Sequence, residues 1–211
     1  CADDLDDQMT AEQLARFDAL RAKLPATKAS FANSAAIFHG PQTHLDLVRP
    51  GIALYGARAS ENIPTSLKPA VGLHGRILQV RDIAPGASVG YGATFVARRP
   101  TRIATIATGY ADGYERALGN MPPRARPLVW INGHPAPLAG RVSMDMITAD
   151  ITDLPQDAVC EGDWAELFGV HQTVDDLADI CGTIGYELLT GFGSRAARVG
   201  WRGDGSPIRS E

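Results

Sequence analysis

Apolar residues near the start of the chain recur at helical spacing. The stretch MTAEQLARFDALRAKLP, residues 9–25, places an apolar residue at every third or fourth position, which predicts a helix. Thr10 is followed three residues later by Gln13, a pattern that resembles a capping box, and Pro25 is expected to stop the helix. The repeating apolar residues are Leu14, Phe17, Leu20 and Leu24.

Two short apolar segments follow this predicted helix. They are ASFANSAAIF, residues 29–38, and LDLVRPGIALYG, residues 45–56, and each has strand-like content bounded by Gly or Pro. A helix followed by compact strands is typical of a parallel α/β repeat. We therefore expect the first part of the chain to be the end of such a repeat.

The character of the sequence changes after Gly56. Residues 57–70, ARASENIPTSLKPA, are polar and contain prolines, as a linker does. Beyond them, short alternating segments are separated by turn signals, which predicts a mainly antiparallel β domain from about 70 to 170. The best hairpin candidate is LVWINGHPAPLAG, because its Asn132-Gly133 step suits a type I′ turn.

Helical signals return near the end of the chain. Thr173 precedes the segment VDDLADIC and has Asp176 three residues on, so we expect it to cap a helix. A further helical turn is expected in TIGYELLTGF, from Thr183.

Composition narrows the class of protein. With 211 residues, 45% of them hydrophobic, the chain can bury one large core or two unequal ones. A formal net charge of −4 without a basic stripe disfavours nucleic acid and points to a small molecule or another protein as partner. No run of about 18 apolar residues predicts a membrane span.

Cysteine and histidine usage adds two expectations. The three cysteines, Cys1, Cys160 and Cys181, argue against a disulfide framework and are compatible with a reducing, cytoplasmic compartment. The five histidines show no ligand-like spacing, so no metal site is expected. The chain opens on Cys1 without an initiator methionine, which leaves a preceding segment possible.

Tyr91 stands between Gly90 and Gly92 in SVGYGATF, and TGYADGY repeats the Gly-Tyr step at Gly109-Tyr110. Glycine permits close backbone approach and unusual dihedral angles, so the pattern indicates a phenol presented at a turn or strand end. An ordinary strand with a bulge is the alternative.

Polar groups also stand at the ends of the two expected parallel strands. Ser34 in NSAA and the amides of Gly51 and Ile52 lie where α/β barrels build ligand sites and often bind phosphate. Ser34 could instead bond a neighbouring backbone group, and Arg49 could form a surface ion pair.

Six segments occur in order: ANSAA, VRPGIALYG, VGYGATF, GYADGYER, GRVSMDM and IGYELL. As a set they resemble the alanine racemase family, pyridoxal 5'-phosphate enzymes that have an N-terminal (β/α)8 barrel and a C-terminal β domain. The resemblance implies an α/β plus β fold, with the last part of the barrel over residues 1–60 and the β domain over 61–211. It also implies interconversion of L-alanine and D-alanine, which supplies D-alanine for peptidoglycan.

The resemblance assigns roles to individual residues. Tyr91 matches the catalytic tyrosine, the acid or base at one face of the substrate's α-carbon. A free phenol has a pKa of about 10, so this role needs positive charge or hydrogen bonds that favour phenolate. Arg49 matches the arginine that faces the pyridine nitrogen and leaves it largely unprotonated. The residues that match the phosphate cradle are Ser34, Gly51, Ile52 and Tyr186.

The same resemblance implies a homodimer whose active sites are shared between subunits. Tyr110 matches a tyrosine near the substrate entrance, and Met144 contributes its backbone near the substrate carboxylate, with Asp145 beside it. In the family, Tyr91, Tyr110 and Met144 reach into the neighbouring barrel. For Met144 a core role is the alternative, because Val142, Met144 and Met146 alternate as in a strand.

The chain departs from the family at the cofactor lysine, which forms the Schiff base and acts on the opposite face. None of Lys23, Lys28 and Lys68 matches that motif. A racemase needs an acid and a base on opposite faces, so we expect the chain to be inactive alone and to be part of a longer enzyme. The uncovered barrel remnant should be poorly ordered or self-associate, whereas the β domain could fold alone.

Two other functions fit parts of the sequence. Decarboxylases of basic amino acids share the barrel and β-domain plan and use a cysteine followed by an aspartate, which VCEGDW resembles at Cys160. We interpret Gly162-Asp163 instead as a turn that enters a strand. A β module that pairs with itself or with a partner, without catalysis, is the other alternative.

Overall fold

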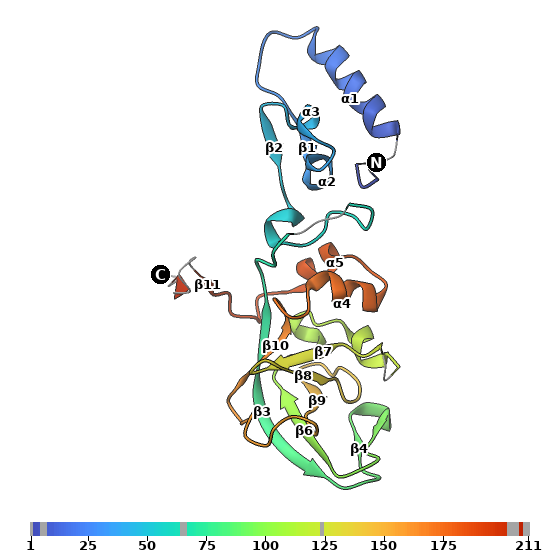
Figure 1. The fold of residues 1–211 in the computed structure, drawn as a ribbon, viewed down its shortest axis with the longest axis vertical. Coiled ribbons are helices and arrows are strands. Elements are labelled where there is room, and N and C mark those ends of the chain that lie inside the picture. The colour runs from blue at the N-terminus through green and yellow to red at the C-terminus, as the bar shows by residue number, and fades with distance from the viewer. Residues whose placement is uncertain (1, 5–7, 64–66, 123–124, 202–206, 209–211) are drawn as a thin grey trace. The chain divides into compact units, whose positions relative to one another are not determined.

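The computed structural model describes residues 2–4, 8–63, 67–122, 125–201 and 207–208. Cys1 and residues 64–66 of the expected linker lie outside these residues. The chain forms two compact units. Figure 1 colours the ribbon by residue number, from blue at the N-terminus to red at the C-terminus. Unit 1 contains residues 1–73 and 168–176, and unit 2 contains residues 74–167 and 177–211. The domain boundary expected near residue 60 stays a prediction.

Unit 1 begins with helix α1, Gln8–Arg21. The expected capping box is wrong, because the helix already includes Gln8 and places Thr10 in its interior. Thr10 is buried, and its hydroxyl has no hydrogen-bond partner among the described residues. The helix ends at Arg21, and two turn hydrogen bonds carry the chain on to Leu24 ahead of the proline. Phe17 packs against Phe31 with ring centroids 5.5 Å apart.

Two parallel strands follow, as the sequence predicts. Strand β1 pairs with strand β2 in a register that places Ser30 opposite Leu47 and Asn33 opposite Arg49. Between the strands lie two helical turns, the first capped by the Asn33 side chain, which accepts a hydrogen bond from the Ala36 amide at 2.9 Å. The elements are β1 (Ser30–Asn33), α2 (Ser34–Ile37), α3 (Pro41–His44), β2 (Leu47–Arg49) and η1 (Ile52–Tyr55).

The described residues of the polar segment that follows η1 pack against other residues of unit 1. Ala57 and Ile63 are buried, and the Arg58 amide donates to the Asp175 carboxylate at 2.8 Å. The Ala70 amide donates to the Tyr55 carbonyl at 3.0 Å. These contacts anchor the segment to unit 1, although its composition resembles that of a flexible linker.

Unit 2 is built on a six-stranded sheet in the order β8-β7-β10-β3-β6-β9, with antiparallel pairing in the four strand pairs whose register is defined. An antiparallel bridge between Leu138 and Ala149 brings its two edges together, so the sheet is nearly closed. The antiparallel β domain is therefore confirmed. Its strands are β3 (Leu73–Ile83), β6 (Thr101–Ile106), β7 (Leu128–Ile131), β8 (His134–Pro137), β9 (Ile147–Asp150) and β10 (Trp164–Phe168).

Local turn and cap signals are also confirmed. Asn132 and Gly133 join β7 to β8 with φ of 48° and 82°, as a type I′ turn requires. The Thr173 hydroxyl accepts from the Asp176 amide at 3.1 Å and caps α4, Val174–Cys181. The expected last helix is α5, Gly185–Gly191.

The remaining strands are short. Strands β4 (Ser88–Val89) and β5 (Phe95–Val96) form one two-stranded ribbon, and β11 (Gly200–Trp201) and β12 (Pro207–Ile208) form another. In the part of the chain that the structure describes, no helix has the length and apolar character needed to cross a membrane.

Candidate functional site

The carboxyl ends of β1 and β2 bring together a strand-end cluster, which comprises Ser34, Arg49, Gly51 and Ile52. Ser34 is 3% exposed, and its Oγ accepts the Gly51 amide at 2.7 Å and, more weakly, the Ala53 amide at 3.4 Å. Ser34 thus bonds backbone groups, as the alternative interpretation expected, but only as an acceptor. Among the described residues its own proton has no acceptor, so the hydroxyl can still donate to an anion.

Arg49 does not form the surface ion pair that a lone arginine usually forms. Its guanidinium donates to the Ser30 hydroxyl through Nη1 and to the Phe31 carbonyl through Nη2 at 3.1 Å. Within the described ranges it contacts no carboxylate. The two neutral acceptors fix its orientation at the end of β2 and leave its positive charge uncompensated.

Tyr91 lies in unit 2 on a turn between β4 and β5, in the short helical segment η2, Tyr91–Ala93. Gly90 and Gly92 have φ of 75° and 72°, the left-handed region that favours glycine. A Cβ added at Gly92 would lie 3.1 Å from Arg141 Nη1, so this turn packs closely on the Arg141 side chain. The Tyr91 side chain is 73% exposed. The alternative of an ordinary bulged strand is wrong.

Tyr110 begins η3, Tyr110–Asp112, a loop that packs on the segment just before β9. Its amide donates to the Ser143 carbonyl at 3.0 Å, and the Ala111 amide donates to the Met144 carbonyl at 2.9 Å. The backbones approach so closely at Gly109 that an added Cβ would lie 2.2 Å from the Met144 carbonyl oxygen. The Tyr110 side chain is 45% exposed.

Met144 and Asp145 stand at the tip of a turn that Ser143 and Met146 close. The Ser143 hydroxyl donates to the Met146 carbonyl at 2.6 Å, and the Ser143 amide donates to the same oxygen at 3.1 Å. Met144 is 51% exposed, so the alternative of a core position in a strand is wrong. Tyr91, Tyr110, Met144 and Asp145 form the loop cluster of unit 2.

Arg195 connects two parts of this loop cluster. Its Nη2 lies 2.7 Å from Asp145 Oδ1, and its Nε lies 3.1 Å from Asp112 Oδ1. The pKa of the guanidinium is raised, first by the hydrogen bond to Asp145 and then by the charge of Asp112. The sequence interpretation missed Arg195 and Arg141, because each acts through contacts distant along the chain and neither carries a local pattern.

Two more tyrosines belong to unit 2. Tyr186, the remaining residue of the predicted phosphate cradle, lies on α5, and partial burial raises the pKa of its phenol, which keeps the phenol a neutral donor. Tyr114 is fully buried, its hydroxyl has no partner among the described residues, and burial raises its pKa strongly. Tyr114 is therefore a packing residue, unlike Tyr110 in the same motif.

The two cysteines that the structure describes, Cys160 and Cys181, show no sign of a reactive site. Burial, followed by the charges of Glu115 and Glu187, raises the pKa of the Cys181 thiol to about 11, so it is not a thiolate at neutral pH. Cys160 lies in the turn before β10, where its amide donates to Asp163 Oδ2 at 2.8 Å and Gly162 has φ of 90°. This confirms the interpretation of Gly162-Asp163 as a turn entering a strand.

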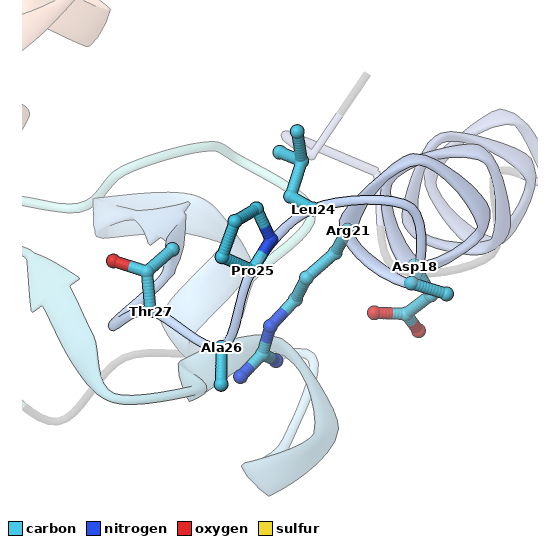
Figure 2. Close-up of a pocket in the computed structure, with 7 residues that line it drawn as sticks. Asp18, Arg21, Leu24, Pro25, Ala26 and Thr27 are labelled. Carbon is cyan, nitrogen blue, oxygen red and sulfur yellow. The ribbon is translucent and has the colours of Figure 1, made fainter.

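A pocket in unit 1 lies apart from these residues along the chain. It is formed where α1 ends, and Figure 2 shows Asp18 and Arg21 on the helix and Leu24, Pro25, Ala26 and Thr27 on the segment that leaves it. Arg21 is already engaged with Asp46, at 3.5 Å. None of the predicted site residues lines this pocket.

The whole chain resembles one enzyme family. The family described as alanine racemase, N-terminal domain, matches residues 1–59, and the alanine racemase C-terminal domain matches residues 70–200. The alanine racemase of Stutzerimonas stutzeri is 48% identical over 201 residues, which are 94% of this chain and 54% of that protein. The catabolic alanine racemase of Agrobacterium fabrum is 46% identical over 198 residues, 94% of this chain and 50% of that protein.

A solved structure of an alanine racemase also resembles this chain. The crystal structure of alanine racemase from Bartonella henselae with covalently bound pyridoxal phosphate is 44% identical, with a TM-score of 0.78, and covers 92% of this chain and 52% of that one. The chain thus spans about half the length of the relatives it matches.

The contact at Gly109 supports a prediction about the loop cluster. Gly109→Ala should destabilise the protein by about 3 kcal/mol, because backbone atoms of Met144 cannot rotate away from the new methyl group. Gly191→Ala is the matched control, since its Cβ would lie 3.7 Å from the nearest oxygen and alanine favours helix. Urea unfolding measures both, and equal stability of the two variants would contradict the packing described here.

Proposed function

Since the chain belongs to the alanine racemase family, we propose that it forms part of a pyridoxal 5'-phosphate enzyme that interconverts L-alanine and D-alanine. Residues 1–60 are assigned to the last part of the barrel and residues 61–211 to the C-terminal β domain. None of the three lysines matches the family's cofactor lysine. The activity is therefore assigned to the complete polypeptide that contains these residues.

One observation carries the proposal: the phenol of Tyr91 is exposed on a turn that two glycines and Arg141 hold in place. Exposing a large aromatic side chain has no benefit for the stability of a single chain. A rigid turn that presents a phenol to a second molecule is what a proton-transferring tyrosine requires.

The strand-end cluster fits the phosphate of the cofactor. Among the described residues the Ser34 proton has no acceptor, and the Gly51 backbone lies beside this hydroxyl at the end of β2. Tyr186, in unit 2, is a neutral phenol donor. We assign Ser34, Gly51, Ile52 and Tyr186 to the phosphate. When bound, pyridoxal phosphate supplies the electron sink that makes the α-proton of an amino acid removable.

Arg49 is assigned to the pyridine nitrogen. It carries a permanent charge and keeps all its protons at neutral pH, so it donates a hydrogen bond without transferring the proton. A ring nitrogen left unprotonated restrains the electron sink and favours return of the proton to the α-carbon. Ser30 and Phe31 hold the guanidinium in the orientation that this role needs.

Tyr91 is assigned to proton transfer at one face of the α-carbon. Tyr110 is assigned to the substrate entrance, and the backbone of Met144, with Asp145 beside it, to the substrate carboxylate. Tyr91, Tyr110 and Met144 all project from unit 2 into solvent, which supports a homodimer in which they enter the site of the partner subunit. Supply of D-alanine to peptidoglycan, in the cytoplasm, is part of the same proposal.

Tyr91→Phe in the complete polypeptide should lower kcat for racemisation by about 10²- to 10⁴-fold, because an acid or base is lost on one face. In deuterium oxide the variant should keep α-deuteration of one alanine enantiomer and lose that of the other. The wild type, and not the variant, should support growth of a D-alanine auxotroph.

Tyr114→Phe is the matched control for Tyr91→Phe. It removes a buried hydroxyl that has no partner among the described residues, so activity and stability should be retained. Unchanged racemisation by Tyr91→Phe would favour the non-catalytic β module, and release of carbon dioxide from a basic amino acid would favour the decarboxylase.

Ser34→Ala should weaken binding of pyridoxal phosphate by about 10- to 100-fold, the effect of losing a hydrogen bond to a charged group. Binding of pyridoxal, which lacks the phosphate, should change little. Cofactor absorbance measured during titration gives both affinities. Ser60→Ala, which removes a hydroxyl that bonds the Asp3 carbonyl, is the control. Equal losses for the two ligands would place Ser34 away from the phosphate.

Mixed dimers test whether sites are shared between subunits. Tyr91→Phe and Arg49→Gln homodimers should each be nearly inactive. After random subunit exchange, about a quarter of wild-type activity should return, because half of the dimers then contain one intact site of two. No recovery, with subunit exchange verified by mass spectrometry, would mean that Tyr91 and Arg49 of the same chain act together.

A further inference from the structure

We propose that Arg195 is a positioning residue. It holds the Tyr110 loop, residues 109–113, and the Met144 turn, residues 143–146, in one fixed arrangement, so that unit 2 presents both to the substrate site together. The effect on catalysis rests on the proposed function. The effect on the two loops rests only on contacts within unit 2.

The contacts of Arg195 join segments that are far apart in the sequence. One guanidinium reaches Asp145 at 2.7 Å, in the Met144 turn, and Asp112 at 3.1 Å, in the Tyr110 loop. Arginine can do this because its planar fork presents Nε and Nη2 in different directions at once. A lysine ammonium on its flexible stem lacks this geometry.

Asp112 links Arg195 to the backbone of the Tyr110 loop. Its Oδ1 faces Arg195, while its Oδ2 accepts the Gly109 amide at 2.9 Å. Gly109 packs so closely on Met144 that an added Cβ would lie 2.2 Å from the Met144 carbonyl oxygen, and Gly113 at the end of the loop packs on the Gly191 carbonyl at the end of α5. Arg195 follows α5 by a few residues, so it ties the end of this helix to both loops.

An isolated surface ion pair contributes little, and Arg195 is about half exposed. This case differs because a single arginine separates two carboxylates. Without it, Asp112 and Asp145 would repel each other, and their charges would act against the carboxylate of an amino-acid substrate. Loss of Arg195 should therefore loosen both loops and weaken substrate binding.

The test compares Arg195→Gln, Arg195→Lys and Arg99→Gln in the complete polypeptide. Arg99 is the matched control, since it pairs with Asp153 at 2.5 Å in the same unit with similar exposure. Arg195→Gln should speed amide hydrogen exchange at 109–113 and 143–146 by more than about tenfold. It should raise KM for alanine by about tenfold, with a smaller fall in kcat. Arg195→Lys should restore little of either, and Arg99→Gln should change neither.

Combining Arg195→Gln with Asp145→Asn distinguishes a positioning role of Arg195 from a general loss of stability. Asp145→Asn should raise KM in the wild type but not in Arg195→Gln, where the contact is already broken and the change removes a carboxylate that acts against the substrate. Unchanged exchange in both loops, or additive effects on KM, would overturn the inference. If the wild type does not racemise alanine but the loops still loosen in Arg195→Gln, the proposed function fails and the inference about the loops stands.

Discussion

The loop cluster depends on close backbone contact along residues 140–144. The Tyr110 loop approaches this segment at Gly109, a second loop approaches it at Gly119, and the β4 strand lies against Gly140. At each of these positions a Cβ would fall under 3.0 Å from a backbone atom. Two loops and strand β4 thus share one support, because glycine lets the backbones meet directly. Tyr91 and Tyr110 lie on elements that contact this segment, and Met144 stands at its end.

The two units contribute different chemistry. Unit 1 provides donors at the ends of parallel strands: the Arg49 guanidinium, the Ser34 hydroxyl and nearby amides. Unit 2 provides phenols and carboxylates on loops. Donors suit an anionic cofactor, whereas a phenol can exchange a proton with substrate. The proposed function needs both sets.

Sequence patterns predicted those features whose causes are local. The Asn132-Gly133 turn and the Thr173 cap follow from residues at most three positions apart, and both have the predicted geometry. The prediction of a Thr10 cap was wrong because a capping pattern does not determine where the helix begins. Local sequence patterns could not predict the contacts of Arg195, because its partner Asp145 is 50 residues away and only the fold brings them together.

The hydrogen-bond partners of Arg195 and Arg49 distinguish an arginine with a structural role from one with a chemical role. Arg195 lies between two carboxylates, which satisfy its charge and leave it little capacity for a ligand. Arg49 donates to a hydroxyl and a carbonyl, so its geometry is fixed while its charge stays available. A guanidinium held by neutral acceptors can act on a bound group, because a ligand does not have to displace a carboxylate. The same type of side chain thus fixes loops in unit 2 and, in the proposed function, faces the cofactor in unit 1.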